Sequence, residues 1–169
     1  QDGDLDLLFL TDRAYWRENA AGIWQPPREI VHDVDPDPSV HLVDLDKDSD
    51  LDLLVGSYSG IIWVQNDGSG NFGEPRRIET LPSIVVLPAD VDGDGDLDIV
   101  RHALAPQSDL SMIAWHENLD GQGDFGRRVI ANTGATSIAV ADFDGDGDLD
   151  IATQSSRTDQ GSYYENTDG

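Results

Sequence analysis

The sequence contains no cysteine, so no disulfides are present from which a redox compartment could be inferred; a secreted protein can do without them if metals brace it. Basic residues are scarce as well: ten Lys and Arg stand against 34 Asp and Glu, and the formal net charge is −24. Such a chain repels the phosphates of nucleic acid and anionic lipid, and no partner of either kind is expected. No apolar run reaches the length of about 18 residues that a membrane helix needs, so we expect no membrane insertion.

The negative charge is concentrated in short segments. Eighteen of the 34 acids lie in four stretches, which together with Lys47 carry −17 of the net charge. The clearest stretch, residues 89–100, returns almost unchanged as residues 141–152, with an aspartate at every second position. Carboxylates at this spacing repel one another unless a cation lies among them. Ca²⁺ is the cation that such loops suit, because it takes six to eight oxygen ligands and glycine allows a short loop to turn around it.

The acidic stretch is part of a longer repeat. A weaker copy spans residues 43–54, and the chain begins inside a fourth copy. The last aspartates of the copies are separated by 46, 46 and 52 residues, and they are Asp6, Asp52, Asp98 and Asp150. A period of this size is typical of a four-stranded propeller blade. We therefore expect one propeller region over residues 1–169, with units at about 1–34, 35–82, 83–133 and 134–169.

Each unit has the pattern of β-strands and shows no credible helix. The apolar residues alternate or form short runs rich in Val, Ile and Leu. In the third unit we expect strands at 84–87, from 97, at 111–118 and at 125–130. Counting in this way predicts three, four, four and three strands in the successive units. The expected fold is all-β, an arc of about four four-stranded antiparallel blades that forms part of a larger propeller.

The second half of each unit carries an aromatic residue followed three positions later by asparagine. The four pairs are Trp16 and Asn19, Trp63 and Asn66, Trp115 and Asn118, and Tyr163 and Asn166. An aromatic that recurs once per unit is typical of packing between neighbouring blades, although a platform for stacking a sugar is an alternative. We expect the asparagine side chains to close the turns that follow them.

These residues resemble the FG-GAP or VCBS repeats, found in integrin alpha-subunit heads and in many secreted bacterial proteins. The family pattern D-x-D-x-D-G-x-x-D matches residues 90–98 and 142–150 in full, and the trailing aromatic-x-x-Asn segments resemble the bacterial branch. The resemblance implies a calcium-binding propeller of six to eight blades. It also implies a secreted or cell-surface protein of bacterial origin, which agrees with loops that bind calcium at roughly 10⁻⁵ to 10⁻³ M.

The resemblance also implies the metal ligands. In the third unit these are the side chains of Asp90, Asp92, Asp94 and Asp98, with the backbone carbonyl of Asp96; in the fourth they are Asp142, Asp144, Asp146 and Asp150, with Asp148 at the carbonyl position. The second unit offers Asp44, Asp46, Asp48, Asp50 and Asp52. Ser49 replaces the turn glycine there and Lys47 adds a positive charge, so we expect a weaker site. The first unit retains only Asp2, Asp4 and Asp6, and we do not expect calcium there.

Two other uses of these residues fit less well. An EF-hand needs glutamate at the twelfth loop position, where this chain has Val55, Arg101 and Thr153, and it needs a helix afterwards. The four histidines, His32, His41, His102 and His116, share no repeat position and show no metal-ligand spacing. The sequence shows no cluster of Arg and His and no acid–base pair, so we expect no catalytic residues.

Two functions from different classes remain. The first is a non-catalytic, calcium-binding scaffold that presents loops to a protein or glycan at the cell surface, as in adhesion. The second is a part of a secreted polysaccharide-acting enzyme such as a lyase, because the resemblance reaches propeller domains of that kind. The strongest motif of the chain serves structure, and this favours the scaffold.

Overall fold

The computed structural model describes residues 3–35, 38–104, 111–133, 135–155 and 160–167. Within these ranges all regular elements are β-strands, and there is no helix that could cross a membrane. The strands are β1 (Leu7–Leu10), β2 (Arg13–Arg17), β3 (Asn19–Ala20), β4 (Ile23–Trp24), β5 (Arg28–His32), β6 (Ser39–Val43), β7 (Asp52–Ser57), β8 (Gly60–Val64), β9 (Arg76–Glu79), β10 (Ser83–Ala89), β11 (Asp98–Leu104), β12 (Ser111–Asn118), β13 (Phe125–Thr133), β14 (Ser137–Ala141), β15 (Asp150–Ser155) and β16 (Gln160–Tyr164).

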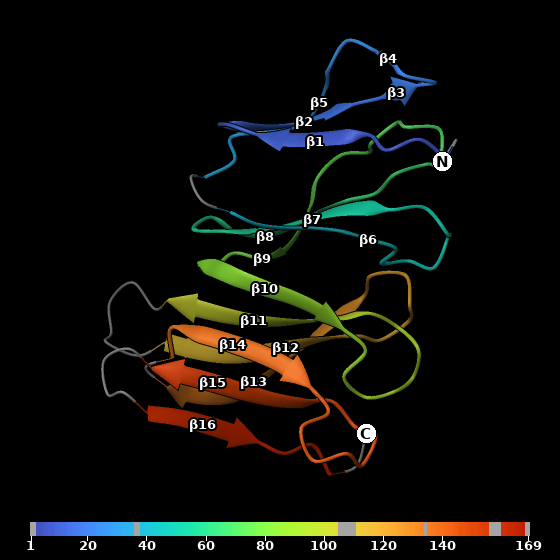
Figure 1. Ribbon diagram of the computed structural model, residues 1–169. Helices are drawn as coiled ribbons and strands as arrows, with labels where there is room; N and C mark the ends of the chain where they lie inside the picture. Colours follow the sequence, from blue (N-terminus) through green and yellow to red (C-terminus); the bar gives the residue numbers. More distant parts are fainter. Residues whose placement is uncertain (1–2, 36–37, 105–110, 134, 156–159, 168–169) are drawn as a thin grey trace.

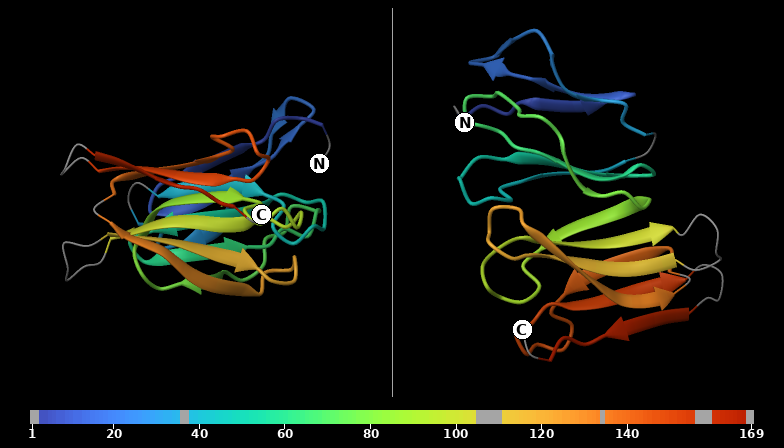
Figure 2. Two further views of the ribbon diagram at one scale, coloured as in Figure 1. Left: turned by 90° about the horizontal axis from the view of Figure 1, so that it is seen from below. Right: turned by 180° about the vertical axis from the view of Figure 1, so that it is seen from behind.

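The strands form four antiparallel sheets that follow one another along the chain. Their orders are β1-β2-β5, β6-β7-β8-β9, β10-β11-β12-β13 and β14-β15-β16, and β3 and β4 form a separate hairpin. The described strands thus number three, four, four and three in the main sheets, as the sequence predicts. Figure 1 shows the sheets stacked in chain order, and Figure 2 shows the same stack from below and from behind.

In the third sheet the strands occupy the expected positions with small differences in length. β12 has the expected bounds, and β11 begins one residue later than expected, at Asp98. β10 extends beyond the expected residues 84–87 at both ends, and β13 extends beyond the expected end at residue 130. The extra residues are ladder positions with neutral or polar side chains, which periodicity alone does not mark as strand.

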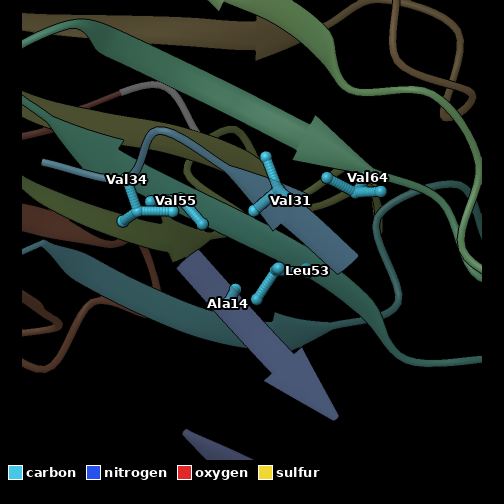
Figure 3. Close-up of a cluster of buried hydrophobic side chains, with 6 residues drawn as sticks. All are labelled: Ala14, Val31, Val34, Leu53, Val55 and Val64. Atoms are coloured by element: carbon cyan, nitrogen blue, oxygen red, sulfur yellow. The ribbon is translucent and has the colours of Figure 1, made fainter. Parts of the chain in front are cut away.

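Apolar side chains fill the space between successive sheets. The first such cluster, between the sheets of β1 and β6, contains Ala14, Val31, Val34, Leu53, Val55 and Val64 (Figure 3). All residues of β7 are buried: Leu53 and Val55 belong to this cluster, whereas Leu54 belongs to the next one. A strand buried on both faces requires a continuous apolar run, and this explains the sequence after the second acidic loop.

The acidic segments connect the first and second strands of each unit. They join β6 to β7, β10 to β11 and β14 to β15. In Figure 1 these three connections lie along the same edge of the stack, the edge at which both ends of the chain are labelled. The fold therefore places successive acidic loops side by side.

Candidate metal centre

The three acidic loops share one backbone conformation, which the aspartates themselves hold. Each loop is numbered by its unit, so residues 44–52, 90–98 and 142–150 are the second, third and fourth loops. In the third loop Asp90 accepts from Gly95 N at 3.0 Å, and Asp94 accepts from Asp96 N at 2.8 Å. Equivalent bonds occur in the other two loops. Gly93 and Gly95 have φ of +70° and +90°, so the chain turns twice through the left-handed region. Glycine enters this region without steric cost.

The second loop makes the same turns without glycine. Lys47 has φ +59° and Ser49 has φ +75°, at the positions of Gly93 and Gly95. Although Ser49 replaces the turn glycine, the loop keeps the shape of the other two. The cost is backbone strain, roughly 1 kcal/mol or more for each residue held in this region.

The first three aspartates of each loop converge. The groups are Asp44, Asp46 and Asp48; Asp90, Asp92 and Asp94; and Asp142, Asp144 and Asp146, and within each group the oxygens lie within 4.8 Å of one another. Oδ1 of Asp44 and Oδ1 of Asp90 are buried and accept no hydrogen bond. A buried carboxylate oxygen without a donor is costly unless a cation pairs with it. Three hard carboxylates in a short loop fit Ca²⁺, and these nine residues are the ones that would hold it.

The electrostatics around Asp144 in the fourth unit favour a cation. The pKa of Asp144 is raised above its ordinary value, first by desolvation and then by the negative charges of Asp146 and Asp150. Neighbouring carboxylates thus oppose one another's ionisation. A divalent ion among them would relieve this repulsion.

The last aspartate of each loop lies outside the converging group. In the second unit Asp52 is fully buried; its Oδ1 accepts from Asn66 N at 2.8 Å, and its Oδ2 accepts from Trp63 Nε1 at 2.8 Å and Leu45 N at 3.4 Å. Asp98 and Asp150 accept the equivalent backbone N–H groups. The structure therefore places the expected fourth ligand where it ties the loop to the end of the third strand.

This arrangement predicts that the last aspartate supports the fold without calcium. Asp52→Ala leaves three buried donors without an acceptor, so the unfolding free energy should fall by about 2 to 3 kcal/mol in both chelator and calcium. Urea unfolding under the two conditions measures this loss. Asp48→Asn is the matched control, because its effect should be confined to the calcium-loaded protein. A loss from Asp52→Ala that appeared only in calcium would instead assign Asp52 to the ion.

The aspartate two residues before the last one in each loop is not part of the converging group either. These aspartates are Asp50, Asp96 and Asp148. The carboxylates of Asp50 and Asp96 lie against the turn after the asparagine: a Cβ at Gly68 would come within 2.2 Å of Asp50 Oδ2, and one at Gly121 within 2.6 Å of Asp96 Oδ2. In the first unit Asp4 Oδ2 accepts from Ala21 N at 2.7 Å. The backbone N–H of Asp148 donates to Asp146 at 3.0 Å. Asp6 accepts from Trp16 and Asn19, and Asp2 lies outside the described residues.

The repeated aromatics and asparagines join neighbouring units. The ring of Trp63 lies where a Cβ of Gly123 would be, 2.1 Å from it, and meets Phe125 edge-on with ring centroids 6.5 Å apart. Trp16 packs in the same way on Gly70 and Phe72. The expectation of packing between blades is thus confirmed at these two junctions. The turn-closing role of asparagine is confirmed as well, since Oδ1 of Asn19, Asn66 and Asn118 accepts from Gly22 N, Gly68 N and Gly123 N.

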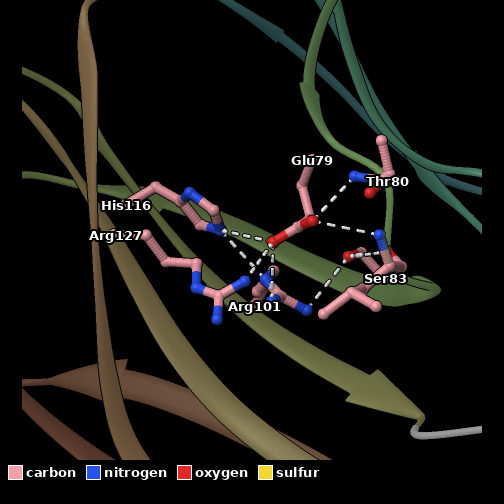
Figure 4. A network of polar contacts seen from close by, with 7 residues as sticks. Glu79, Thr80, Ser83, Arg101, His116 and Arg127 are labelled. Carbon is pink, nitrogen blue, oxygen red and sulfur yellow. Dashed lines mark hydrogen bonds and ion pairs between the residues drawn. The ribbon is translucent and has the colours of Figure 1, made fainter.

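A buried polar cluster corrects the expectation that Arg and His do not gather. Glu79 of β9 accepts from Arg101 of β11 at 2.9 Å and from Arg127 of β13 at 3.1 Å, and Arg101 Nε donates to His116 Nε2 of β12 at 2.9 Å (Figure 4). These residues are far apart in sequence, so spacing could not reveal them. One signal existed: Arg101 occupies the position that holds Val55 and Thr153 in other units.

Ionisation in this cluster follows from burial. Burial, and then the charge of Arg101, lowers the pKa of His116 to about 4, so the imidazole is neutral near pH 7 and Nε2 can accept the bond from Arg101. Burial alone would raise the pKa of Glu79, but bonds from Leu81 N and Thr80 N and the charge of Arg101 hold it below its ordinary value. Arg101 is 0% exposed and His116 2%. The cluster therefore joins two sheets, with Arg101 and His116 buried between them and the side chain of Arg127 partly exposed at its rim.

A groove opens where the first sheet meets the second. Its volume is about 610 Å³, and its lining includes Trp16, Phe72, Glu18, Asp6 and Asp50. Aromatic faces beside carboxylates can contact both the apolar face and the hydroxyl groups of a sugar. This groove is the larger of the two hollows characterised among the described residues.

The comparisons with known proteins agree with this geometry. A lectin from Agrocybe aegerita, whose structure is described as the basis of specific recognition of non-reducing terminal N-acetylglucosamine, is similar with a TM-score of 0.60 and 19% identity. The similarity covers 90% of this chain and 43% of the lectin chain, so this chain spans less than half of it. No curated protein matches. The model of the FG-GAP-like repeat matches residues 44–101 and 103–153, and the chain therefore belongs to the FG-GAP-like repeat family.

Proposed function

We propose that this chain is a calcium-binding β-propeller scaffold that presents a surface to a protein or glycan ligand. One observation carries the proposal: three successive units place three aspartates within 4.8 Å of one another at the same turn. Each group brings three negative charges together at one edge of the stack of sheets. Bound Ca²⁺ would neutralise most of this charge and brace the connection between the first two strands of the blade.

The affinity expected of such loops favours an extracellular setting. Short aspartate loops bind usefully between roughly 10⁻⁵ and 10⁻³ M, a range that extracellular calcium fills and resting cytosolic calcium does not. We therefore propose a secreted or cell-surface location.

The exposed aromatic surface of the last unit supports further blades as partners. Trp63 is buried by the turn of the next unit, whereas Tyr163, at the same repeat position, is 47% exposed and contacts Phe143, which is 51% exposed. A turn like that at Gly123 and Phe125 would cover this face. We propose that the four units at 1–34, 35–82, 83–133 and 134–169 are an arc of one larger propeller.

The groove beside Trp16 supports a glycan as the ligand. Calorimetric titration with N-acetylglucosamine and its oligomers tests this. Glu18→Gln should weaken binding at least about fivefold, because it removes the charge and replaces one accepting carboxylate oxygen by an amide donor. Among the described residues the Glu18 side chain pairs with Arg28 at 3.8 Å, a long and partly exposed ion pair, so its loss should leave the fold intact. Glu165→Gln, an exposed change in the last unit, is the matched control. Equal affinities for the two variants would rule out this groove, and no binding of any sugar would direct the search to protein ligands.

A further inference from the structure

The side chain of Lys47 reaches out of its own loop into the next one. Lys47 belongs to the second loop, yet its Nζ forms an ion pair with Asp96 Oδ1 of the third. A Cβ at Gly95 would lie 3.6 Å from the same Nζ. The pKa of Lys47 is raised, first by its hydrogen bond to Asp96 and further by the charges of Asp94 and Asp90. The positive charge therefore lies in the third loop at Gly95 and Asp96, directly after Asp94 of the converging group.

The backbone of Lys47 explains this direction. Its φ of +59° is the conformation that Gly93 and Gly145 adopt at the same position of the later loops, where no side chain projects. The junction itself is close, because Asn118 Nδ2 of the third unit donates to Leu45 O of the second loop at 3.1 Å. A four-carbon side chain leaving the loop at this point meets the neighbouring acids.

We propose that Lys47 is an affinity-determining residue for the third loop: its ammonium occupies part of the negative field there, pins the second unit to the third without calcium, and weakens calcium binding to Asp90, Asp92 and Asp94. This inference rests on the proposed calcium binding. It differs from the sequence expectation, in which Lys47 weakens the site of its own loop. It also predicts different calcium affinities for the third and fourth loops, although their sequences are nearly identical. The loop before the third has Lys47, whereas the loop before the fourth has Gly93 at the same position.

The test isolates one loop at a time in the full chain. Asp48→Asn and Asp146→Asn remove a charge from the second and fourth loops and keep the oxygen that accepts from Asp50 N and Asp148 N. In this background calcium calorimetry reports on the third loop. Lys47→Gln should tighten its binding by roughly three- to tenfold, and Lys47→Arg, which keeps the charge, should leave it near the parent value. In chelator, Lys47→Gln should unfold at a slightly lower temperature than Lys47→Arg.

A transplant gives the converse test. Gly93→Lys places a lysine at the matching point of the third loop, where an added side chain meets open space. In a chain whose second and third loops carry Asp48→Asn and Asp94→Asn, it should weaken calcium binding to the fourth loop by a similar factor, roughly three- to tenfold. Unchanged third-loop affinity in Lys47→Gln would overturn this inference while calcium binding still stood. So would tightening of the second loop alone, measured in a chain that carries Asp94→Asn and Asp146→Asn in place of Asp48→Asn and Asp146→Asn. No calcium binding in the parent chain would overturn both proposals.

Discussion

Replacing Glu79 with alanine is expected to lower the unfolding free energy by about 3 to 5 kcal/mol, among the largest effects of any single substitution in this chain. The carboxylate is the counter-charge of Arg101, which is fully buried, and it also accepts from Thr80 N at 2.7 Å. Without it the buried guanidinium of Arg101 loses its counter-charge, and the backbone N–H groups of Thr80 and Leu81 lose their acceptor. Urea unfolding at pH 7 in chelator measures the loss.

A matched triple variant tells whether the cost of Glu79→Ala comes from leaving Arg101 buried without its counter-charge or from losing the ion pair itself. Glu79→Gln with Arg101→Val and His116→Val copies the second unit, where Val55 and Val64 fill the equivalent positions. Replacing a buried ion pair by apolar residues of suitable size is often nearly neutral, so this variant should lie within about 2 kcal/mol of the parent. Exposed Glu165→Ala controls for the loss of any one acid. If Glu79→Ala were as mild as Glu165→Ala, the cluster would not join the two sheets.

Removal of calcium is expected to lower the melting temperature by roughly 10 to 20 °C. A ligand that binds only the folded chain stabilises it by RT ln(1 + [L]/Kd), so a site with Kd near 10⁻⁵ M in about 1 mM calcium contributes about 2.7 kcal/mol. Two such sites contribute about 5 kcal/mol, and at this chain length each kcal/mol corresponds to about 2 to 4 °C. Thermal melts in calcium and in excess chelator, followed by circular dichroism, measure the shift.

Single-loop variants assign the shift to the proposed sites. Asp94→Asn and Asp146→Asn should each remove part of the calcium-dependent gain and change the melt in chelator little, since asparagine keeps the loop hydrogen bonds. Glu79→Ala should show the opposite behaviour, losing stability in both conditions. A melting curve that chelator leaves unchanged would contradict calcium as a structural ion. Loss of ligand binding in a loop variant whose melt is normal would assign that loop a direct role in recognition.

Local features of this protein follow from the sequence. Alternating aspartates, glycines at left-handed positions and runs such as that of β7 act over a few residues, so the strand counts and the turns closed by Asn19, Asn66 and Asn118 could be predicted. The inter-blade role of Trp63 could be predicted too, because a large aromatic once per unit needs a neighbouring surface to cover it.

The tertiary structure decided which charged groups meet. Arg101 and Glu79 are 22 residues apart and Lys47 and Asp96 are 49 apart, and each pair forms only because two sheets stack in one register. Within one sheet, the pairing of β7 with β8 turns Asp52 towards Trp63 and away from Asp44, Asp46 and Asp48. Electrostatic and hydrogen-bond energies depend on distance and burial, and neither is set by the spacing of residues along a chain. The repeat therefore specifies the blade, whereas packing between blades specifies what each charge does.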